Sequence, residues 1–158
     1  MLEDRTRPGQ GDRVGGSNAP LGSHVSTQGG LEHVPARADE IGVDAIQIFT
    51  SAPQRWSDSR IPDESAAAFR AGVIESGIRT TVAHDSYLIN LATDRKDLLA
   101  RSISAFNAEL ERASLLGLDY LVTHPGNATG GNRTEALNQN ARAVAAALAR
   151  FPDGPTVL

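Results

Sequence analysis

One repeating pattern limits what this chain can fold into more than any other feature. A short apolar run is followed by a polar loop, then by a stretch of helical periodicity, and then by the next apolar run. The runs cover residues 20–25, 45–50, 80–83 and 120–123, and a further run opens at 156–158. Strands that alternate with helices predict a parallel sheet in which consecutive strands lie side by side.

Four helices are expected between these runs, over about residues 31–41, 63–76, 95–116 and 134–150. Glycine at positions 42, 77 and 117 predicts where the first three end. Pro35 lies past the first turn of the first helix, so it is predicted to remove a hydrogen bond and bend that helix. Apolar residues spaced three or four apart predict the buried faces. They include Val34, Ala38 and Ile41; Phe69, Val73 and Ile74; Leu99, Ile103, Phe106 and Leu110; Leu137, Val144 and Leu148.

Four strand–helix units and the start of a fifth strand predict a partial (β/α)₈ TIM barrel, because a complete barrel needs about 250 residues. An open α/β sheet of four or five strands is the alternative, and the pattern fits both. Residues 1–18 are rich in glycine and charge and poor in apolar groups, which predicts a disordered segment. One domain is expected over residues 19–158.

Composition excludes several classes of protein. The chain has no cysteine, so any metal must be held by His, Asp or Glu. No apolar run approaches the roughly 18 residues that span a membrane, and the N-terminus lacks an apolar signal stretch, so we expect a cytoplasmic protein. A net charge of −4 argues against a protein that coats DNA widely, but it is compatible with an enzyme that has one local basic or polar face.

Three of the four histidines occupy the same place in the pattern. His24, His84 and His124 each stand at the end of an apolar run or directly after it, whereas His33 is expected on a helix surface. The carboxyl ends of parallel strands open on one face, which in barrels holds the active site. Neutral imidazole is the commonest metal ligand, so this placement favours a zinc or similar site. Loop histidines that only form hydrogen bonds are the alternative.

The residues directly after His84 are unusual for an exposed loop. Asp85 follows it at once and either fixes the tautomer of an imidazole or caps a turn. Tyr87 and Leu88 come next. They either fold back onto the core or form an apolar probe for a stacked group such as a nucleobase or a sugar.

Several segments of the sequence, taken together, resemble the endonuclease IV family. They follow the family's order from about residue 20 to residue 158 and comprise residues 22–31, 47–50, 53–56, 84–91 and 121–126. The segment 84–91, His-Asp-Ser-Tyr-Leu-Ile-Asn-Leu, is the most specific of them. The resemblance implies the N-terminal half of a xylose isomerase-like TIM barrel with a trinuclear Zn²⁺ site at its C-terminal mouth. It further implies hydrolysis of the phosphodiester 5′ to abasic sites in double-stranded DNA.

The same resemblance assigns roles to individual residues. His84 and His124 correspond to two of the family's zinc ligands. His24 corresponds to a first-strand histidine near the site, without a ligand role; with Asp85 it is a candidate for supporting the ligands. The residues that correspond to the family's DNA contacts are Tyr87, Leu88, Gln54, Arg55 and Trp56.

Two departures from the family pattern bear on function. An arginine that the family often places at position 54 is Gln54 here, with Arg55 one place later. The family's remaining Glu, Asp and His ligands follow the fifth strand or lie on later strands, whereas this sequence stops at Leu158. We therefore expect weak zinc binding and no meaningful nuclease activity from these residues alone.

Two other functions remain open at this point. One is a metal-dependent sugar isomerase or epimerase of the same barrel superfamily, against which the segment 84–91 argues. The other is a non-catalytic fragment.

Overall fold

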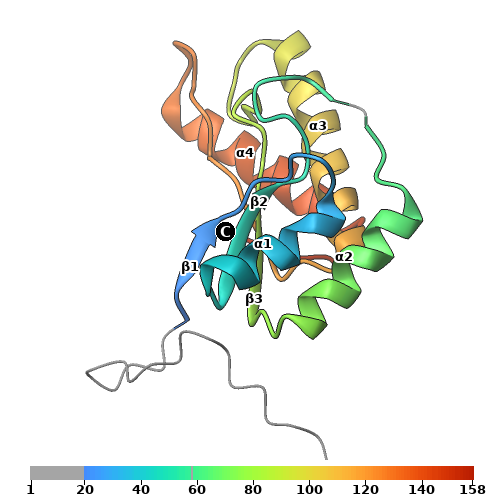
Figure 1. The fold of residues 1–158 in the computed structure, drawn as a ribbon. Coiled ribbons are helices and arrows are strands. Elements are labelled where there is room, and N and C mark those ends of the chain that lie inside the picture. The colour runs from blue at the N-terminus through green and yellow to red at the C-terminus, as the bar shows by residue number, and fades with distance from the viewer. Residues whose placement is uncertain (1–19, 58) are drawn as a thin grey trace, which may run out of the picture.

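A computed structural model describes residues 20–57 and 59–158, so the segment 1–18, for which the sequence predicts disorder, lies outside the described residues. Five parallel strands form one sheet in chain order, as the sequence predicts (Figure 1). They are β1 (Gly22–His24), β2 (Ala45–Phe49), β3 (Thr80–His84), β4 (Tyr120–Val122) and β5 (Thr156–Val157).

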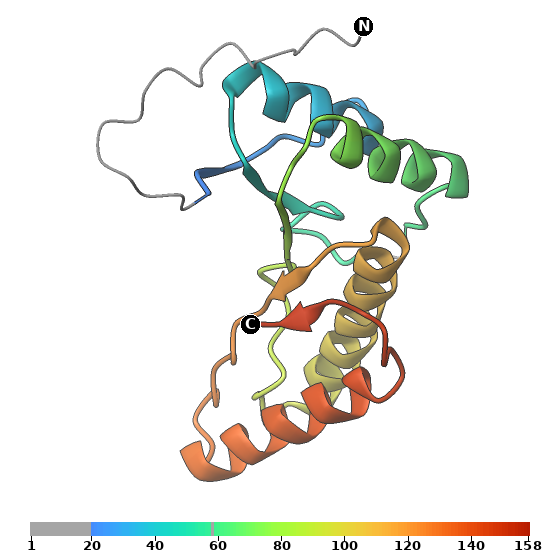
Figure 2. The ribbon, with the colours of Figure 1, turned by 90° about the horizontal axis from the view of Figure 1, so that it is seen from below.

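Helices connect the strands and cover one side of the sheet. A short 3₁₀ turn, η1 (Leu31–His33), leads into α1 (Val34–Ile41), and the other helices are α2 (Asp63–Glu75), α3 (Lys96–Leu116) and α4 (Arg133–Leu148). Figure 2 shows the four α-helices along the outer side of the strands, with the opposite side of the sheet left open in the described part of the chain. Strands in chain order with helices on one side form a partial (β/α)₈ barrel.

The core lies between the sheet and these helices. Alternate strand residues face it, because successive side chains of a strand point to opposite sides. Ile46, Ile48, Ala83 and Leu121 are buried on the helical side. Helix residues that pack there include Phe69, Phe106, Leu110 and Leu116. The other set of strand residues faces the open side, and its members at the carboxyl ends form the site described below.

Local signals explain where several helices begin and end. Gly42 and Gly117 adopt left-handed conformations, with φ of 69° and 66°, and their N–H groups donate to the last carbonyls of α1 and α3. A residue with a side chain rarely adopts this conformation. At the start of α4, the side chain of Asn132 accepts hydrogen bonds from the N–H groups of Thr134 and Glu135.

Some predictions about the helices are wrong. Pro35 does not bend a helix, because the chain first makes η1 and α1 begins only at Val34, which places Pro35 in the first turn. No intrahelical hydrogen bond is lost there. Several residues for which the periodicity predicts burial are instead exposed, namely Ile41, Ala67, Ile74, Ile103, Leu137, Ala141 and Ala145. Within the described ranges, every helix is too short or too polar to cross a bilayer.

Candidate functional site

The carboxyl ends of neighbouring strands bring four rings together in a row. His24, Phe49 and His84 are the last residues of β1, β2 and β3, and the register pairs Phe49 with His84. His124 follows two residues after the end of β4. Successive ring centroids along the row are 5.0, 5.6 and 5.1 Å apart. The structure therefore places His84 and His124 next to each other and separates His24 from them by Phe49.

The hydrogen bond of His84 leaves one of its ring nitrogens available. Nδ1 of His84 lies 2.8 Å from the backbone oxygen of Asp85. A carbonyl oxygen only accepts, so this bond requires Nδ1 to carry the proton. The lone pair of neutral His84 then lies on Nε2, as a metal ligand needs. The side chain is only 12 % exposed.

Asp85 is the most perturbed acid at the site. It is buried, and one carboxylate oxygen accepts a hydrogen bond of 2.5 Å from the Thr123 hydroxyl. Burial raises the pKa of Asp85 from 3.8 to about 6, although the Thr123 bond and the charge of His84 act to lower it. Its other oxygen is 3.7 Å from Nδ1 of His84. Asp85 therefore orients His84 through its backbone carbonyl, with its carboxylate close behind.

His24 has a different environment at the end of β1. Its Nδ1 lies 3.2 Å from the side-chain nitrogen of Gln47, which donates. Nδ1 must then accept, so neutral His24 carries its proton on Nε2. In this tautomer the free side of the ring is a hydrogen-bond donor and not a metal ligand.

Tyr87 stands over the row of rings and remains exposed. Its centroid is 5.4 Å from that of Phe49 and 5.5 Å from that of His84, in edge-on contacts. The residue is 56 % exposed, whereas Leu88 is half-buried. Tyr87 thus lies outside the core and presents an aromatic surface beside the two adjacent histidines.

The loop between β2 and α2 lies against the loop after β3. The backbone oxygen of Pro53 accepts hydrogen bonds from the N–H of Tyr87 at 3.0 Å and from the hydroxyl of Ser86 at 2.9 Å. Gln54 and Arg55 are exposed. Trp56 is half-buried, and the guanidinium of Arg101 on α3 lies 4.6 Å above its ring centroid.

A buried ion pair on α3 holds both ends of this β2–α2 loop. Nη2 of Arg112 lies 2.9 Å from the carboxylate of Glu109, and both residues are at most 5 % exposed. Thr50 and Ser51 donate from their hydroxyls to Glu109, and Arg112 donates to the hydroxyl of Thr50 at 2.9 Å. Arg112 also donates to the backbone oxygen of Ser59. The paired charges thus tie residues 50, 51 and 59 to α3.

Similarity to known proteins assigns the chain to a family. The model of the xylose isomerase-like TIM barrel family matches residues 35–154. The chain belongs to this family. Curated relatives named "Probable endonuclease 4" include proteins of Chloroflexus aggregans, 42 % identical, and Halobacterium salinarum, 38 % identical, both over 138 residues. These alignments cover 87 % of this chain but 48 % and 50 % of the relatives, so the chain spans about half their length.

Solved structures of the family agree with this assignment. Endonuclease IV of Thermus thermophilus superimposes with a TM-score of 0.72 and 29 % identity, over 87 % of this chain and 49 % of that one. A D-psicose 3-epimerase superimposes with a TM-score of 0.62 but only 14 % identity, over 86 % and 50 %, which shows the fold alone. The predicted resemblance to the endonuclease IV family is thereby confirmed.

The donor set of the site fits part of a metal centre of this family. His84 and His124 supply two adjacent imidazoles, which suit zinc. Within residues 20–57 and 59–158, no group of three or more His, Cys, Asp or Glu side chains is placed to hold a metal ion. A catalytic zinc site needs three protein ligands, so the described residues provide two of them.

Three residues of the site were missed in the sequence. In the sequence, Phe49 looks like any apolar strand residue. It lies two residues after polar Gln47, however, and this spacing puts both side chains on the same, open side of the sheet. Glu109 and Arg112 are three apart on a helix, a spacing typical of solvated surface pairs. Only the packing of α3 against the end of β2 reveals that they are buried.

Proposed function

We propose that this chain is part of a zinc-dependent endonuclease that hydrolyses the phosphodiester 5′ to abasic sites in double-stranded DNA. The observation that carries the proposal is the adjacent pair of His84 and His124 beside the exposed ring of Tyr87, where Nε2 of His84 has no hydrogen-bond partner among the described residues. The name of the curated relatives, "Probable endonuclease 4", supports the coarser part of the proposal, an endonuclease. The proposed location is the cytoplasm.

His84 and His124 would hold zinc in this enzyme. When bound, zinc supplies Lewis-acid catalysis of phosphodiester hydrolysis. The protein's own part is to orient the imidazoles, which the backbone oxygen of Asp85 does for His84. In the proposal, the remaining ligands of a trinuclear site come from the part of the relatives that this chain does not span.

The surface around the histidines is suited to a damaged duplex. An abasic nucleotide has lost its base, so extruding it from the helix costs little. The exposed ring of Tyr87, with Leu88 beside it, would fill the vacated stack, as apolar wedges do in kinked DNA. Gln54, Arg55 and Trp56 would face the duplex from the neighbouring loop.

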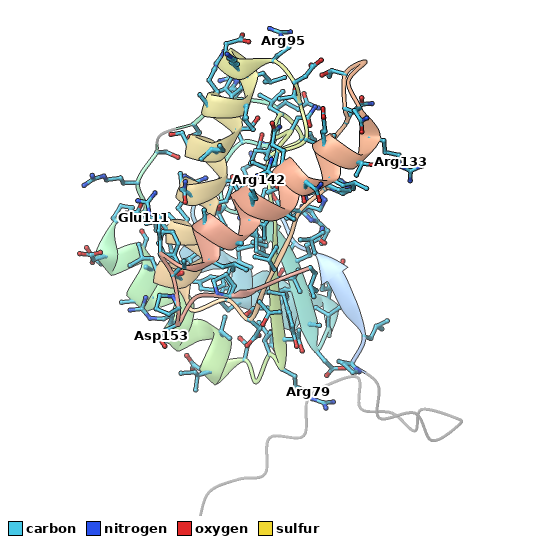
Figure 3. All side chains as sticks on the ribbon, turned by 180° about the vertical axis from the view of Figure 1, so that it is seen from behind. Arg79, Arg95, Glu111, Arg133, Arg142 and Asp153 are labelled. Carbon is cyan, nitrogen blue, oxygen red and sulfur yellow. The ribbon has the colours of Figure 1, made fainter. Side chains whose placement is uncertain are left out.

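Basic residues at the same end would contact phosphates, which is how most proteins position DNA. Arg95 and Arg133 lie at this end of the molecule and Arg79 at the opposite end (Figure 3). Arg60 and Arg101 are also exposed on segments that follow the strand ends.

A nicking assay tests the proposed reaction. We would fuse residues 20–158 to the unmatched remainder of the Chloroflexus aggregans relative and assay a radiolabelled duplex with one abasic site, with and without zinc. We expect nicking 5′ to the site by the fusion, loss of nicking in His84→Ala, and full activity in His33→Ala, whose ring is on the surface. The unfused chain should be inactive, because its described residues offer two ligands where a catalytic zinc site needs three.

A folded, zinc-loaded fusion that leaves the duplex intact would contradict the proposal. Epimerisation of a ketose by the same fusion would indicate the sugar enzyme instead. A fusion inactive on both substrates would favour a non-catalytic fragment.

DNA recognition is tested separately by mobility shift with the same fusion. Tyr87→Ala should reduce the preference for abasic over intact duplex about tenfold, because stacking on one aromatic ring is worth roughly 1–3 kcal/mol. Tyr87→Phe is the matched control and should keep the preference. Equal preference in wild type and Tyr87→Ala would exclude Tyr87 from recognition.

A further inference from the structure

We infer that Asn90 is a positioning residue for the metal site, because its side chain holds the turn that carries His124 against the loop that follows His84. This inference rests on the proposed function, in which His84 and His124 are zinc ligands.

The side-chain amide of Asn90 uses both of its ends on the loop after β4. Its Nδ2 donates to the backbone oxygen of Asn127 at 2.9 Å, and its Oδ1 accepts from the N–H of Asn127 at 2.9 Å. The same oxygen accepts from the N–H of Ala92 at 3.1 Å. The Asn90 amide thus bonds both backbone groups of Asn127, as a neighbouring strand would. It links the loop after β3 to the loop after β4, which are not joined by a β-ladder.

Asn90 is itself anchored to the core. Its backbone N–H donates at 3.0 Å to the hydroxyl of Ser102, which is fully buried on α3. The turn is therefore tied through Asn90 to the longest helix. Asn140 on α4 adds a second tie, because its Nδ2 donates to the backbone oxygen of Pro125 at 3.0 Å.

Gly126 shows how closely Asn90 approaches the turn. Its φ is +88°, and a Cβ atom built there would overlap Oδ1 of Asn90. The oxygen of Asn90 occupies the space that a side chain would fill, so this turn accepts only glycine. The sequence His124-Pro125-Gly126 and the residue Asn90 are thus parts of one arrangement.

His124 needs this support because its ring has none of its own. Among the described residues, the imidazole of His124 forms no hydrogen bond, whereas that of His84 is held by Asp85. The residue is also exposed. The direction of its side chain is then set by its backbone, and that backbone is fixed by Asn90. Ligands that are held in place before the metal arrives bind it more tightly.

Zinc affinity of the 158-residue chain tests this inference, measured by competition with a chromophoric chelator. We expect Asn90→Ala to weaken zinc binding about tenfold or more, as loss of residues that support ligands does. Asn107→Ala is the matched control and should change nothing, since its amide donates only to Ile103 of its own helix. In a His124→Ala background, Asn90→Ala should have no further effect, because it acts through His124.

The outcomes separate this inference from the proposed function. If His84→Ala and His124→Ala leave zinc binding unchanged, or the wild-type chain binds no zinc, the proposed ligands fail. If they weaken it and Asn90→Ala does not, the role of Asn90 is overturned while the ligands stand. An equal loss from Asn90→Ala with and without His124 would also overturn it, because Asn90 would then act on the fold as a whole.

Amide hydrogen exchange in the metal-free chain gives a second readout that does not depend on zinc. In Asn90→Ala the N–H of Asn127 should exchange much faster, whereas the N–H groups of Asp85 and Leu158, which bond within the sheet, should keep their rates. Asn90→Asp keeps the accepting oxygen but removes the donor to Asn127, and it replaces the alanine variant in both measurements if that variant does not fold. Unchanged exchange at Asn127 would overturn the inference whatever the zinc data show.

Discussion

The ends of β1 and β3 each carry a histidine that packs against Phe49, but the two histidines differ in burial and in their hydrogen bonds. His24 is exposed, and its Nδ1 accepts a hydrogen bond from Gln47, which leaves the proton on Nε2. Neither ring nitrogen then offers a free lone pair to a metal. His84 is nearly buried, has Nε2 free and lies beside His124. In the proposed site, a strand-end position is therefore not sufficient for a ligand, because the partner of one ring nitrogen determines whether the other can bind a metal.

The two strand ends also differ in how their loops are held. The loop after β1 is held from the surface by Arg37, which donates to the backbone oxygens of Ser26 and Gln28 at 2.6 Å each. Behind the end of β3, the carboxylates of Asp85 and Glu109 are both buried, and Arg112 compensates the second. Buried polar side chains are thus concentrated behind the proposed ligand His84.

The largest expected effect follows from removing the buried cation. Arg112→Met should lower the free energy of unfolding by about 3–5 kcal/mol, because it leaves the charge of Glu109 buried without its partner. Arg37→Met at the β1 end should cost less, about 1.5–3 kcal/mol or the worth of one hydrogen bond from a charged group, because it leaves no buried charge and water can reach the freed oxygens of exposed Ser26 and Gln28. Urea unfolding measures both, and equal losses would remove the contrast between the two ends.

A pH effect of about 3 kcal/mol is expected from Asp85, at 1.36 kcal/mol per pKa unit. Its folded pKa of about 6 lies above the ordinary value of 3.8, so the native state binds more protons between these values. The stabilisation is complete below pH 3.8 and is lost as the pH rises through 6. Asp85→Asn should abolish this part of the pH dependence in the metal-free chain.

Exposed Asp97 is the control for the pH experiment. The hydrogen bond from Arg95 holds the pKa of Asp97 below its usual range, so its small stabilisation is lost as the pH falls. Asp97→Asn should therefore act in the opposite direction to Asp85→Asn. Parallel pH profiles of the free energy of unfolding for wild type and Asp85→Asn would contradict the burial argument.

Zinc affinity gives the most direct comparison of the two histidines, with the smallest expected free-energy change. His84→Ala should weaken binding by roughly 100-fold, at or above the loss typical of supporting residues. His24→Ala should leave affinity within about twofold, because Gln47 occupies Nδ1 of His24 and Nε2 carries the proton. Isothermal titration of the two variants decides, and a large loss in His24→Ala would show that it is a ligand after all.

Much of the fold could be predicted because local and long-range signals agree. The apolar runs coincide with β1 to β5, and Gly42 and Gly117 end helices in the expected left-handed conformation. The wrong predictions concern positions where the local sequence allows more than one structure and tertiary contacts determine which one forms. Pro35 fits a helix that starts later than expected, and α2 buries Phe69 while Ile74 is 80 % exposed.

The site could be predicted only in outline. Strand-end placement indicated the three histidines, and the structure shows which two are adjacent. Nothing in the sequence indicated that a main-chain oxygen orients His84, because a neighbouring carboxylate was the more obvious partner. Burial of the Glu109–Arg112 pair depends on the contacts of α3 with the loop after β2, which no short-range pattern encodes.

The stacked pair of Trp56 and Arg101 provides an intrinsic fluorescence probe of one loop. The chain contains a single tryptophan, so its indole emission arises from the loop after β2 and from nowhere else. The guanidinium above the ring is a nearby charge, and its departure toward a phosphate would shift the emission spectrum. A fluorescence titration with duplex would therefore follow this one loop without any attached dye.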